Sequence, residues 1–181
     1  MKLNYKSILT IVALMATGAS ANAGMITDWY AGAMAGIGGA TLVSKDHRFS
    51  HSAQVYGGVI GVDLPVVRFE AEYNYTNSDP INMNLVMGNA YVKLPAFIGT
   101  NPYIGVGVGL MFDAKTDYYD KKIDANIAYQ GMLGTTLEIP VLPFKIDVEG
   151  RAMMVPEIYS VGDQKYNVIQ YDGRVKLRYI F

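Results

Sequence analysis

The 181-residue chain contains no cysteine, and this absence excludes several classes of protein. Disulfide scaffolds, iron–sulfur clusters, thiol nucleophiles and lipid anchors on an N-terminal cysteine all require that residue. Charged residues make up only 17% of the sequence, and the formal net charge is −1. Because nucleic-acid-binding proteins carry a basic stripe, this balance argues against a nucleic-acid partner. The low charge together with 51% apolar residues also argues against intrinsic disorder.

Long apolar runs are missing as well, except near the N-terminus. After residue 23 no stretch of about 18 apolar residues occurs, so the sequence offers no membrane-spanning helix there. A chain that is half apolar and lacks such a helix needs another way to place its apolar side chains.

Residues 1–23 have the features of a secretory signal peptide. Lys2 and Lys6 supply the positive charge, and residues 8–16 form an apolar core that is too short for a membrane anchor. The residues that define the expected A-x-A cleavage site are Ala21, Ala23 and Gly24. The sequence therefore predicts two parts: a signal peptide over 1–23 and one mature domain over 24–181.

The mature domain alternates apolar and polar residues with a period of two, which indicates β-strands. The C-terminal segment shows this most clearly, because Leu177 and Tyr179 alternate with Lys176 and Arg178. The expected strands are 29–38, 54–62, 65–76, 84–94, 102–112, 125–139, 143–154 and 168–181. Eight strands leave about 20 residues for each strand and its connection, which suits membrane-crossing strands of about 9–11 residues.

The expected connections differ between the two ends of the strands. Polar segments occur near 44–52, 76–83, 113–124 and 155–166, and we expect them to be long loops. Short connections that contain proline alternate with them, at 63–65, 94–102 and 139–143. Short turns at one end and longer polar loops at the other are typical of outer-membrane barrels.

The charged face of these strands is predicted to line the interior. In a soluble, lipocalin-like barrel the charged face would meet water, but aromatic residues here gather near strand ends, as they do in membrane interfaces. The fold class expected is therefore an all-β, eight-stranded, antiparallel up-and-down transmembrane barrel. The charges assigned to its interior are Arg68, Glu70, Glu72, Lys93, Glu138, Lys145, Asp147, Glu149, Arg151, Asp172, Arg174, Lys176 and Arg178.

Those interior charges nearly balance, with seven positive and six negative residues. An isolated charge in a confined interior is costly, whereas a paired charge is tolerated. The balance favours a salt-bridge network that fills the barrel, and we expect Gly105, Gly107 and Gly109 to leave room for the long side chains. An ion-selective pore, which would need an excess of one sign or a wider bore, is the alternative.

Several segments together resemble the small outer-membrane barrels of the opacity-protein-like, porin family, with the transmembrane domain of outer-membrane protein A as a wider relative. They are the signal peptide, Trp29-Tyr30-Ala31-Gly32, residues 102–109 and Arg178-Tyr179-Ile180-Phe181. The resemblance implies a Gram-negative outer membrane, contact with its lipid, insertion by the barrel-assembly machinery, and loops that bind extracellular or host partners. It also implies that Leu177, Tyr179 and Phe181 form the assembly signal.

Other candidate sites are weaker. His51 lies between Ser50 and Ser52 in an expected polar loop, and it is the residue to test for a lipid-A-modifying activity. His47 and His51 with Asp46 form a minimal metal-ligand set, and residues 118–122 form a candidate contact patch. Neither has the spacing of a known motif, so the sequence predicts no catalytic residue, metal or cofactor. The expected function is a non-enzymatic envelope or surface-interaction barrel, with a narrow small-solute channel as the alternative.

Overall fold

The computed structural model describes residues 27–43, 48–78, 81–96, 99–116, 119–123, 126–138, 142–161 and 164–181. The predicted signal peptide and its cleavage site lie outside these ranges, as does His47. The boundary at residue 24 therefore stays a prediction. None of the described residues belongs to a helix long and apolar enough to cross a membrane.

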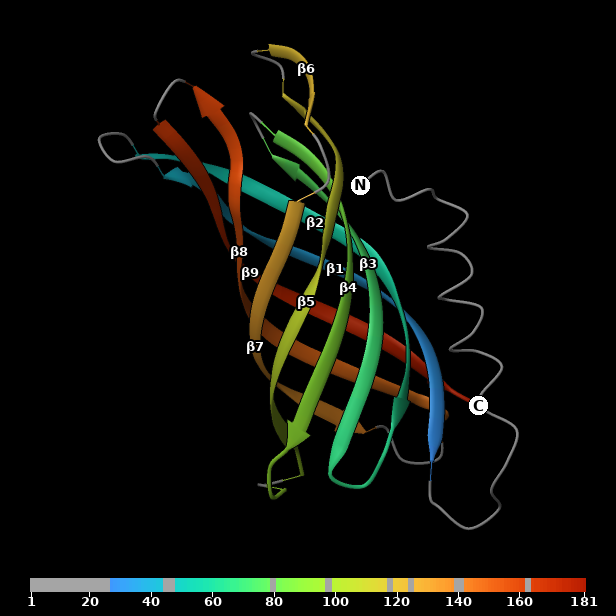
Figure 1. The fold of residues 1–181 in the computed structure, drawn as a ribbon. Coiled ribbons are helices and arrows are strands. Elements are labelled where there is room, and N and C mark those ends of the chain that lie inside the picture. Colours follow the sequence, from blue (N-terminus) through green and yellow to red (C-terminus); the bar gives the residue numbers. More distant parts are fainter. Residues whose placement is uncertain are drawn as a thin grey trace.

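The described residues form antiparallel strands, and eight of them close into a barrel (Figure 1). The strands are β1 (Asp28–Val43), β2 (Arg48–Asp63), β3 (Val67–Ser78), β4 (Ile81–Lys93), β5 (Asn101–Thr116), β6 (Tyr119–Ile123), β7 (Asn126–Glu138), β8 (Phe144–Val161) and β9 (Gln164–Ile180). The ring order is β1-β2-β3-β4-β5-β7-β8-β9, because β9 pairs with β1 and β4 pairs with β5. The short strand β6 is an addition that pairs with β5. The predicted eight-stranded barrel is thus confirmed.

The two ends of the barrel are distinguished by the chain termini. At one end, called here the N/C end, Tyr30 near the start of β1 lies opposite Ile180 near the end of β9. At the other end, called here the distal end, Val43 of β1 pairs with Arg48 of β2. Figure 1 shows the hairpins of the distal end reaching beyond the barrel wall.

The expected long polar loops are corrected by the strand lengths. Seven of the eight barrel strands have 13 to 18 residues and β3 has 12. Together with β6 they continue through most of 44–52, 76–83, 113–124 and 155–166. His51, expected in a loop, lies in β2 opposite Ala40. The physical reason is that backbone pairing needs no apolar side chain, so a ladder continues into water where both faces are polar. Polar composition therefore marked protruding hairpins and not loops.

The alternation of side chains is as expected. On β5, Ile104, Val106 and Val108 are 53%, 68% and 54% exposed on the outer wall. On β3, Arg68, Glu70 and the following even-numbered residues are buried in the interior. The odd-numbered residues Phe69 and Tyr73 of the same strand face outward. The barrel is consequently apolar outside and charged inside, the reverse of a soluble barrel.

Candidate functional site: the interior charge network

Three strands supply most of the interior charges. Strands β3, β8 and β9 each place every second residue inside, so a run such as Asp172, Arg174, Lys176 and Arg178 projects into the lumen from one strand. Ten of the thirteen residues assigned to the interior are at most 6% exposed. They are Arg68, Glu70, Glu72, Asp147, Glu149, Arg151, Asp172, Arg174, Lys176 and Arg178.

Arg174 lies at the centre of the network. Its Nη1 and Nη2 donate to the two carboxylate oxygens of Glu72 at 2.7 and 3.1 Å, and its Nε donates to Glu149 Oε1 at 2.6 Å. Glu149 is on the neighbouring strand β8, but Glu72 is on β3, beyond both β1 and β2 in the ring. A planar guanidinium forms this fork geometry with one carboxylate and still has a donor for a second. Arg174 therefore connects opposite sides of the interior.

Lys176 makes the neighbouring contacts toward the N/C end. Its Nζ donates to Glu70 Oε1 at 2.8 Å and lies 3.4 Å from Glu149 Oε2. Glu70 also accepts hydrogen bonds from the hydroxyls of Tyr30 and Tyr91, both at 2.9 Å. Because several donors share the Glu70 carboxylate, its buried charge is compensated without water.

A second cluster is centred on Asp147, closer to the N/C end. Its carboxylate accepts hydrogen bonds from Arg68 Nη1 at 3.0 Å, Arg178 Nη2 at 2.8 Å and Thr136 Oγ1 at 2.7 Å. Strands β3 and β8, which carry Arg68 and Asp147, are four positions apart in the eight-stranded ring. This contact therefore spans the full width of the barrel.

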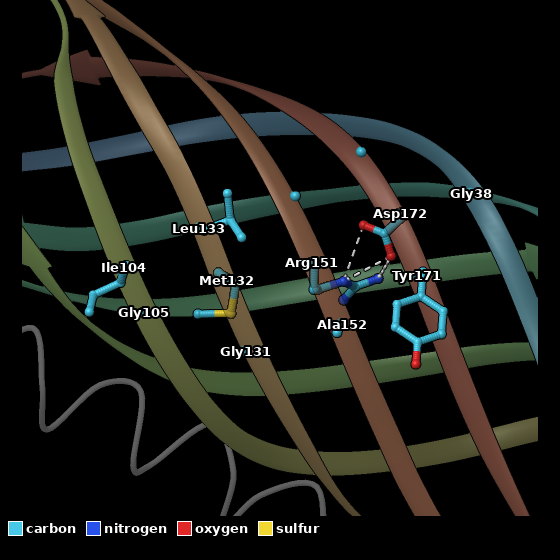
Figure 2. Close-up of a pocket in the computed structure, with 12 residues that line it drawn as sticks. Gly38, Ile104, Gly105, Gly131, Met132, Leu133, Arg151, Ala152, Tyr171 and Asp172 are labelled. Atoms are coloured by element: carbon cyan, nitrogen blue, oxygen red, sulfur yellow. Dashed lines mark hydrogen bonds and ion pairs between the residues drawn. The ribbon is translucent and has the colours of Figure 1, made fainter.

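A third cluster lies toward the distal end, behind a shallow hollow in the outer wall. Figure 2 shows Arg151 of β8 and Asp172 of β9 pointing toward each other, and Arg151 Nη2 donates to Asp172 Oδ2 at 2.6 Å. Arg151 also donates to Gln130 at 3.2 Å, and Gln130 donates to Asn89 Oδ1 at 2.7 Å. Asn89 in turn donates to Glu72 at 2.8 Å, so this cluster joins the contacts of Arg174.

The remaining three predicted residues lie at the N/C mouth and are partly exposed. Lys93 and Lys145 have side chains that are 28% and 19% exposed, and Glu138 is 53% exposed. Lys93 and Lys145 both pair with Asp63, and Lys145 lies 3.3 Å from Glu138. Asp63 was missed by the sequence analysis, which placed it in a connection. It is 5% exposed, and the alternation of Val55 and Val59 along β2 could have placed it inside.

A buried apolar layer on the distal side of the charges was also missed. Its members come from β4, β5, β7, β8 and β9 and are at most 2% exposed: Met83, Leu85, Met87, Met111, Ala128, Met153, Val155 and Val168. They occupy the inward positions of their strands, like the charges that lie nearer the N/C end. The interior thus has a charged part and, on the distal side, a methionine-rich cluster beside the buried polar residues Asn74, Thr76 and Gln170. The alternation of Met83, Leu85 and Met87 with their neighbours is the signal that could have revealed it.

The residues of the expected assembly signal lie on the outer wall. Leu177, Tyr179 and Phe181 are 48%, 45% and 67% exposed. The ring of Tyr179 lies 5.3 Å from that of Phe144 and 5.9 Å from that of Phe181, between centroids. The Phe181 N–H donates to Trp29 O at 3.0 Å, which ties the chain end to β1. Tyr179 and Phe181 form an aromatic patch with Phe144 at the N/C edge. The role of Leu177, Tyr179 and Phe181 in assembly stays a prediction.

The other candidates are described only in part, because Asp46 and His47 lie outside the described ranges. His51 and Ser52 are exposed near the distal end of β2. Among the described residues, no group of three or more His, Asp or Glu side chains could hold a metal ion. Side chains 118–122 lie outside the description.

The sequence matches no protein-family model and no curated protein. Solved structures do match the fold. Neisserial surface protein A is 16% identical with a TM-score of 0.60, and the match covers 82% of this chain and 95% of that one. The N-terminal β-barrel domain of OprF from Pseudomonas aeruginosa is 13% identical with a TM-score of 0.54, covering 82% and 97%. Outer membrane protein AlkL is 15% identical with a TM-score of 0.52, covering 90% and 94%.

These likenesses show that the chain has the fold of the small eight-stranded outer-membrane barrels, as its sequence suggested. In this chain a closed hydrogen-bonded ring carries large exposed apolar side chains outside and paired charges inside. Closed barrels of this kind are the form in which strands cross a membrane, because no backbone group is left unpaired in lipid. The chain therefore has the fold in which strands cross bacterial outer membranes.

Proposed function

We propose that this protein is a closed, non-enzymatic barrel that serves the envelope as a structural element and as a carrier of surface-exposed hairpins. The observation that carries the proposal is the contact of Arg174 with Glu72 and Glu149, which joins opposite sides of the lumen through side chains that are fully buried. A barrel of eight strands has an interior that side chains can fill.

The charge balance supports the closed state over the channel. Among the described residues, eleven charges are at most 6% exposed, five cations and six anions including Asp63, and each of them contacts a residue of opposite sign. A selective pore needs a ring of one sign or open width along its axis. The methionine-rich cluster fills the distal side of the lumen together with the buried polar residues Asn74, Thr76 and Gln170, so side chains pack the interior there as well.

The orientation follows from the extent of the strands. Exposed apolar residues reach the N/C edge at Phe144 and Phe181, whereas the distal hairpins continue past Tyr56 into the polar residues His51 and Ser52. In outer-membrane barrels the longer segments face the outside of the cell. We therefore place the distal hairpins outside, where they are available to extracellular or host ligands, and the N/C end in the periplasm, the side of the barrel-assembly machinery.

Planar-bilayer recording of the purified mature chain tests the closed state. We expect no discrete conductance steps at neutral pH, with a general porin added to the same membrane as the positive control. Reproducible unitary steps from the chain itself, lost when the protein is heat-denatured, would contradict the proposal. They would favour the small-solute channel.

The non-enzymatic part of the proposal has its own test at His51. We expect the mass spectrum of lipid A to be identical in cells that carry the wild-type chain, the His51→Ala variant or no copy. A modified lipid A species that appears with the wild type and disappears with His51→Ala would contradict it.

A further inference from the structure

The β1–β2 hairpin has an unpaired edge at the distal end of the barrel. Strand β2 pairs with β3 only as far as Ala53, which lies opposite Ser78. Its pairing with β1 continues beyond that point for five residues, from Ser52 to Arg48. On the other side this stretch, called here the β2 edge (residues 48–52), has no neighbouring strand in the described part of the chain. Figure 1 shows the tip of the β1–β2 hairpin apart from the β3–β4 hairpin.

The backbone groups of Ser50 and Arg48 point outward from this edge. The carbonyl oxygen of Ser52 faces the β3 side, because it accepts a hydrogen bond from Ser78 Oγ at 2.9 Å. In an antiparallel ladder the N–H and C=O of one residue point to the same side, and successive residues alternate between the two sides. The N–H and C=O groups of Ser50 and Arg48 therefore point away from β1, whereas those of the intervening residues point toward it.

The β2 edge lacks two of the devices that protect exposed strands. Natural sheets block such edges with proline and with bulges, among other means. The β8–β9 hairpin has both, since Pro156 lies within β8 and the register shifts between Val155 and Tyr159. Strand β2 contains no proline, and its ladder with β1 runs without a register shift from one end to the other. A regular edge of this kind is a template for a further strand.

The edge is also held in place before any partner arrives. Strand β1 pairs with β9 at this level, with Val43 opposite Asn167. Strand β9 pairs in turn with β8, with Val168 opposite Val155. The β2 edge is therefore the margin of a four-stranded sheet in the order β2-β1-β9-β8. Donors and acceptors that are already oriented lose little freedom on binding.

We propose that the β2 edge binds an extended segment of another polypeptide, which adds to the sheet as a strand antiparallel to β2. Hydrogen bonds to the backbone of Ser50 and Arg48 hold the added strand, in the mode known as β-augmentation. Two β2 edges in one membrane do not form this pair, because β2 runs from the distal end toward the N/C end in every copy. The inference rests on the proposed surface interaction and its orientation, which place the distal end outside the cell.

Amide NMR of the full mature chain, refolded in detergent micelles, tests the proposal with a soluble strand-forming peptide, acetyl-KTVTVTK-amide, as the probe. In the free chain we expect the N–H groups of Arg48 and Ser50 to exchange with water faster than that of Phe49, which faces β1. Saturating peptide should shift the amide signals of residues 48–52 and slow the exchange of Arg48 and Ser50. The same peptide with every backbone nitrogen methylated has no backbone donor and should cause neither change.

Two substitutions at one residue separate the backbone donor from the side chain. Ser50→Pro removes an outward N–H and no bond to β1, so the Kd for the peptide should rise about tenfold. Ser50→Ala keeps that N–H and should leave the Kd within about twofold of the wild-type value.

If Ser50→Pro does not refold, the methylated peptide on the wild-type chain serves as the second measurement. Slow exchange of the Ser50 N–H in the free chain, equal binding by Ser50→Pro or by the methylated peptide, or signal changes confined to other strands would overturn the proposal. These results are independent of the bilayer recording, because a strand added at this edge does not require a closed lumen.

Discussion

Arg174 and Glu72 form a two-point ion pair although 102 residues of sequence separate them. Both side chains are completely buried, and the strands that carry them are not neighbours in the barrel. A buried pair contributes little when it is compared with a well-packed apolar pair, but removal of one partner leaves the other as an uncompensated charge. The network therefore makes the closed state sensitive to single substitutions.

The first prediction concerns this pair. Arg174→Met should lower the free energy of unfolding by about 3–5 kcal/mol, because Glu72 and Glu149 lose their shared cation. Urea unfolding in lipid vesicles, followed by the fluorescence of the single tryptophan, Trp29, measures this change. The double variant with Glu72→Gln should cost less than the sum of the two single changes.

The outer wall supplies the control for that measurement. Val175→Leu, next to Arg174 but 51% exposed to lipid, should change the free energy by less than about 0.5 kcal/mol. A cost below about 1 kcal/mol for Arg174→Met would show that water reaches the interior and compensates the carboxylates.

The faces of these strands could be predicted from the sequence, because a period of two fixes the side of every residue once one is assigned. Thus Arg174, Lys176 and Arg178 were all placed inside. The pairing of Arg68 with Asp147 could not be predicted in this way. The pairing depends on which strands close the ring and on the stagger between neighbouring strands. Neither can be read from the sequence of a single strand.

Two further features were missed for local reasons. Asp63 was missed because the strand was expected to end at residue 62, where proline-containing sequence begins. The apolar cluster was missed because Met83 was assigned to the expected polar segment 76–83 and no apolar residue of the expected strand 84–94 was assigned to the interior.

The second prediction compares two glycines that differ in which way they face. At Gly107 an added Cβ would overlap Asn89 Oδ1 and lie 2.9 Å from Gln130 Cγ in the interior. Gly107→Ala should therefore destabilise the barrel by about 1–3 kcal/mol through overpacking. At Gly131, which faces the lipid, an added Cβ meets nothing within 4 Å, so Gly131→Ala should be neutral or slightly stabilising. Equal costs in urea unfolding would refute the filled interior.

The third prediction tests the lipid-facing wall. Val106 is 68% exposed near the middle of the crossing part of β5. Val106→Arg should cost about 2–4 kcal/mol in lipid vesicles, because an arginine near the midplane of the bilayer is poorly solvated. Val66→Arg, with a residue that is 61% exposed in the turn at the N/C end, should cost about 0–1 kcal/mol. A similar cost for both in the vesicle assay would argue against the proposed position of the bilayer.

The fourth prediction tests the orientation and uses the absence of native cysteine. Ser52→Cys is exposed at the distal end, and Val66→Cys is exposed at the N/C end. A membrane-impermeant maleimide added to intact cells should label Ser52→Cys and leave Val66→Cys unlabelled. After the envelope is permeabilised, both should react. Labelling of Val66→Cys alone in intact cells would reverse the orientation.

The last prediction separates assembly in the cell from stability in the membrane. Phe181 is 67% exposed, and among the described residues it makes a backbone hydrogen bond to Trp29 O and a ring contact with Tyr179. Removal of so few contacts should lower the free energy of unfolding by no more than about 1 kcal/mol. Deletion of Phe181 should nevertheless reduce the yield of folded barrel in cells several-fold, as expected if assembly machinery recognises the terminal aromatic. The readout is the fraction of chain that keeps its heat-modifiable mobility in gel electrophoresis, compared with the refolding yield of the same variant in vesicles. Deletion that lowers both yields equally would assign Phe181 to stability, and deletion that lowers neither would remove it from the assembly signal.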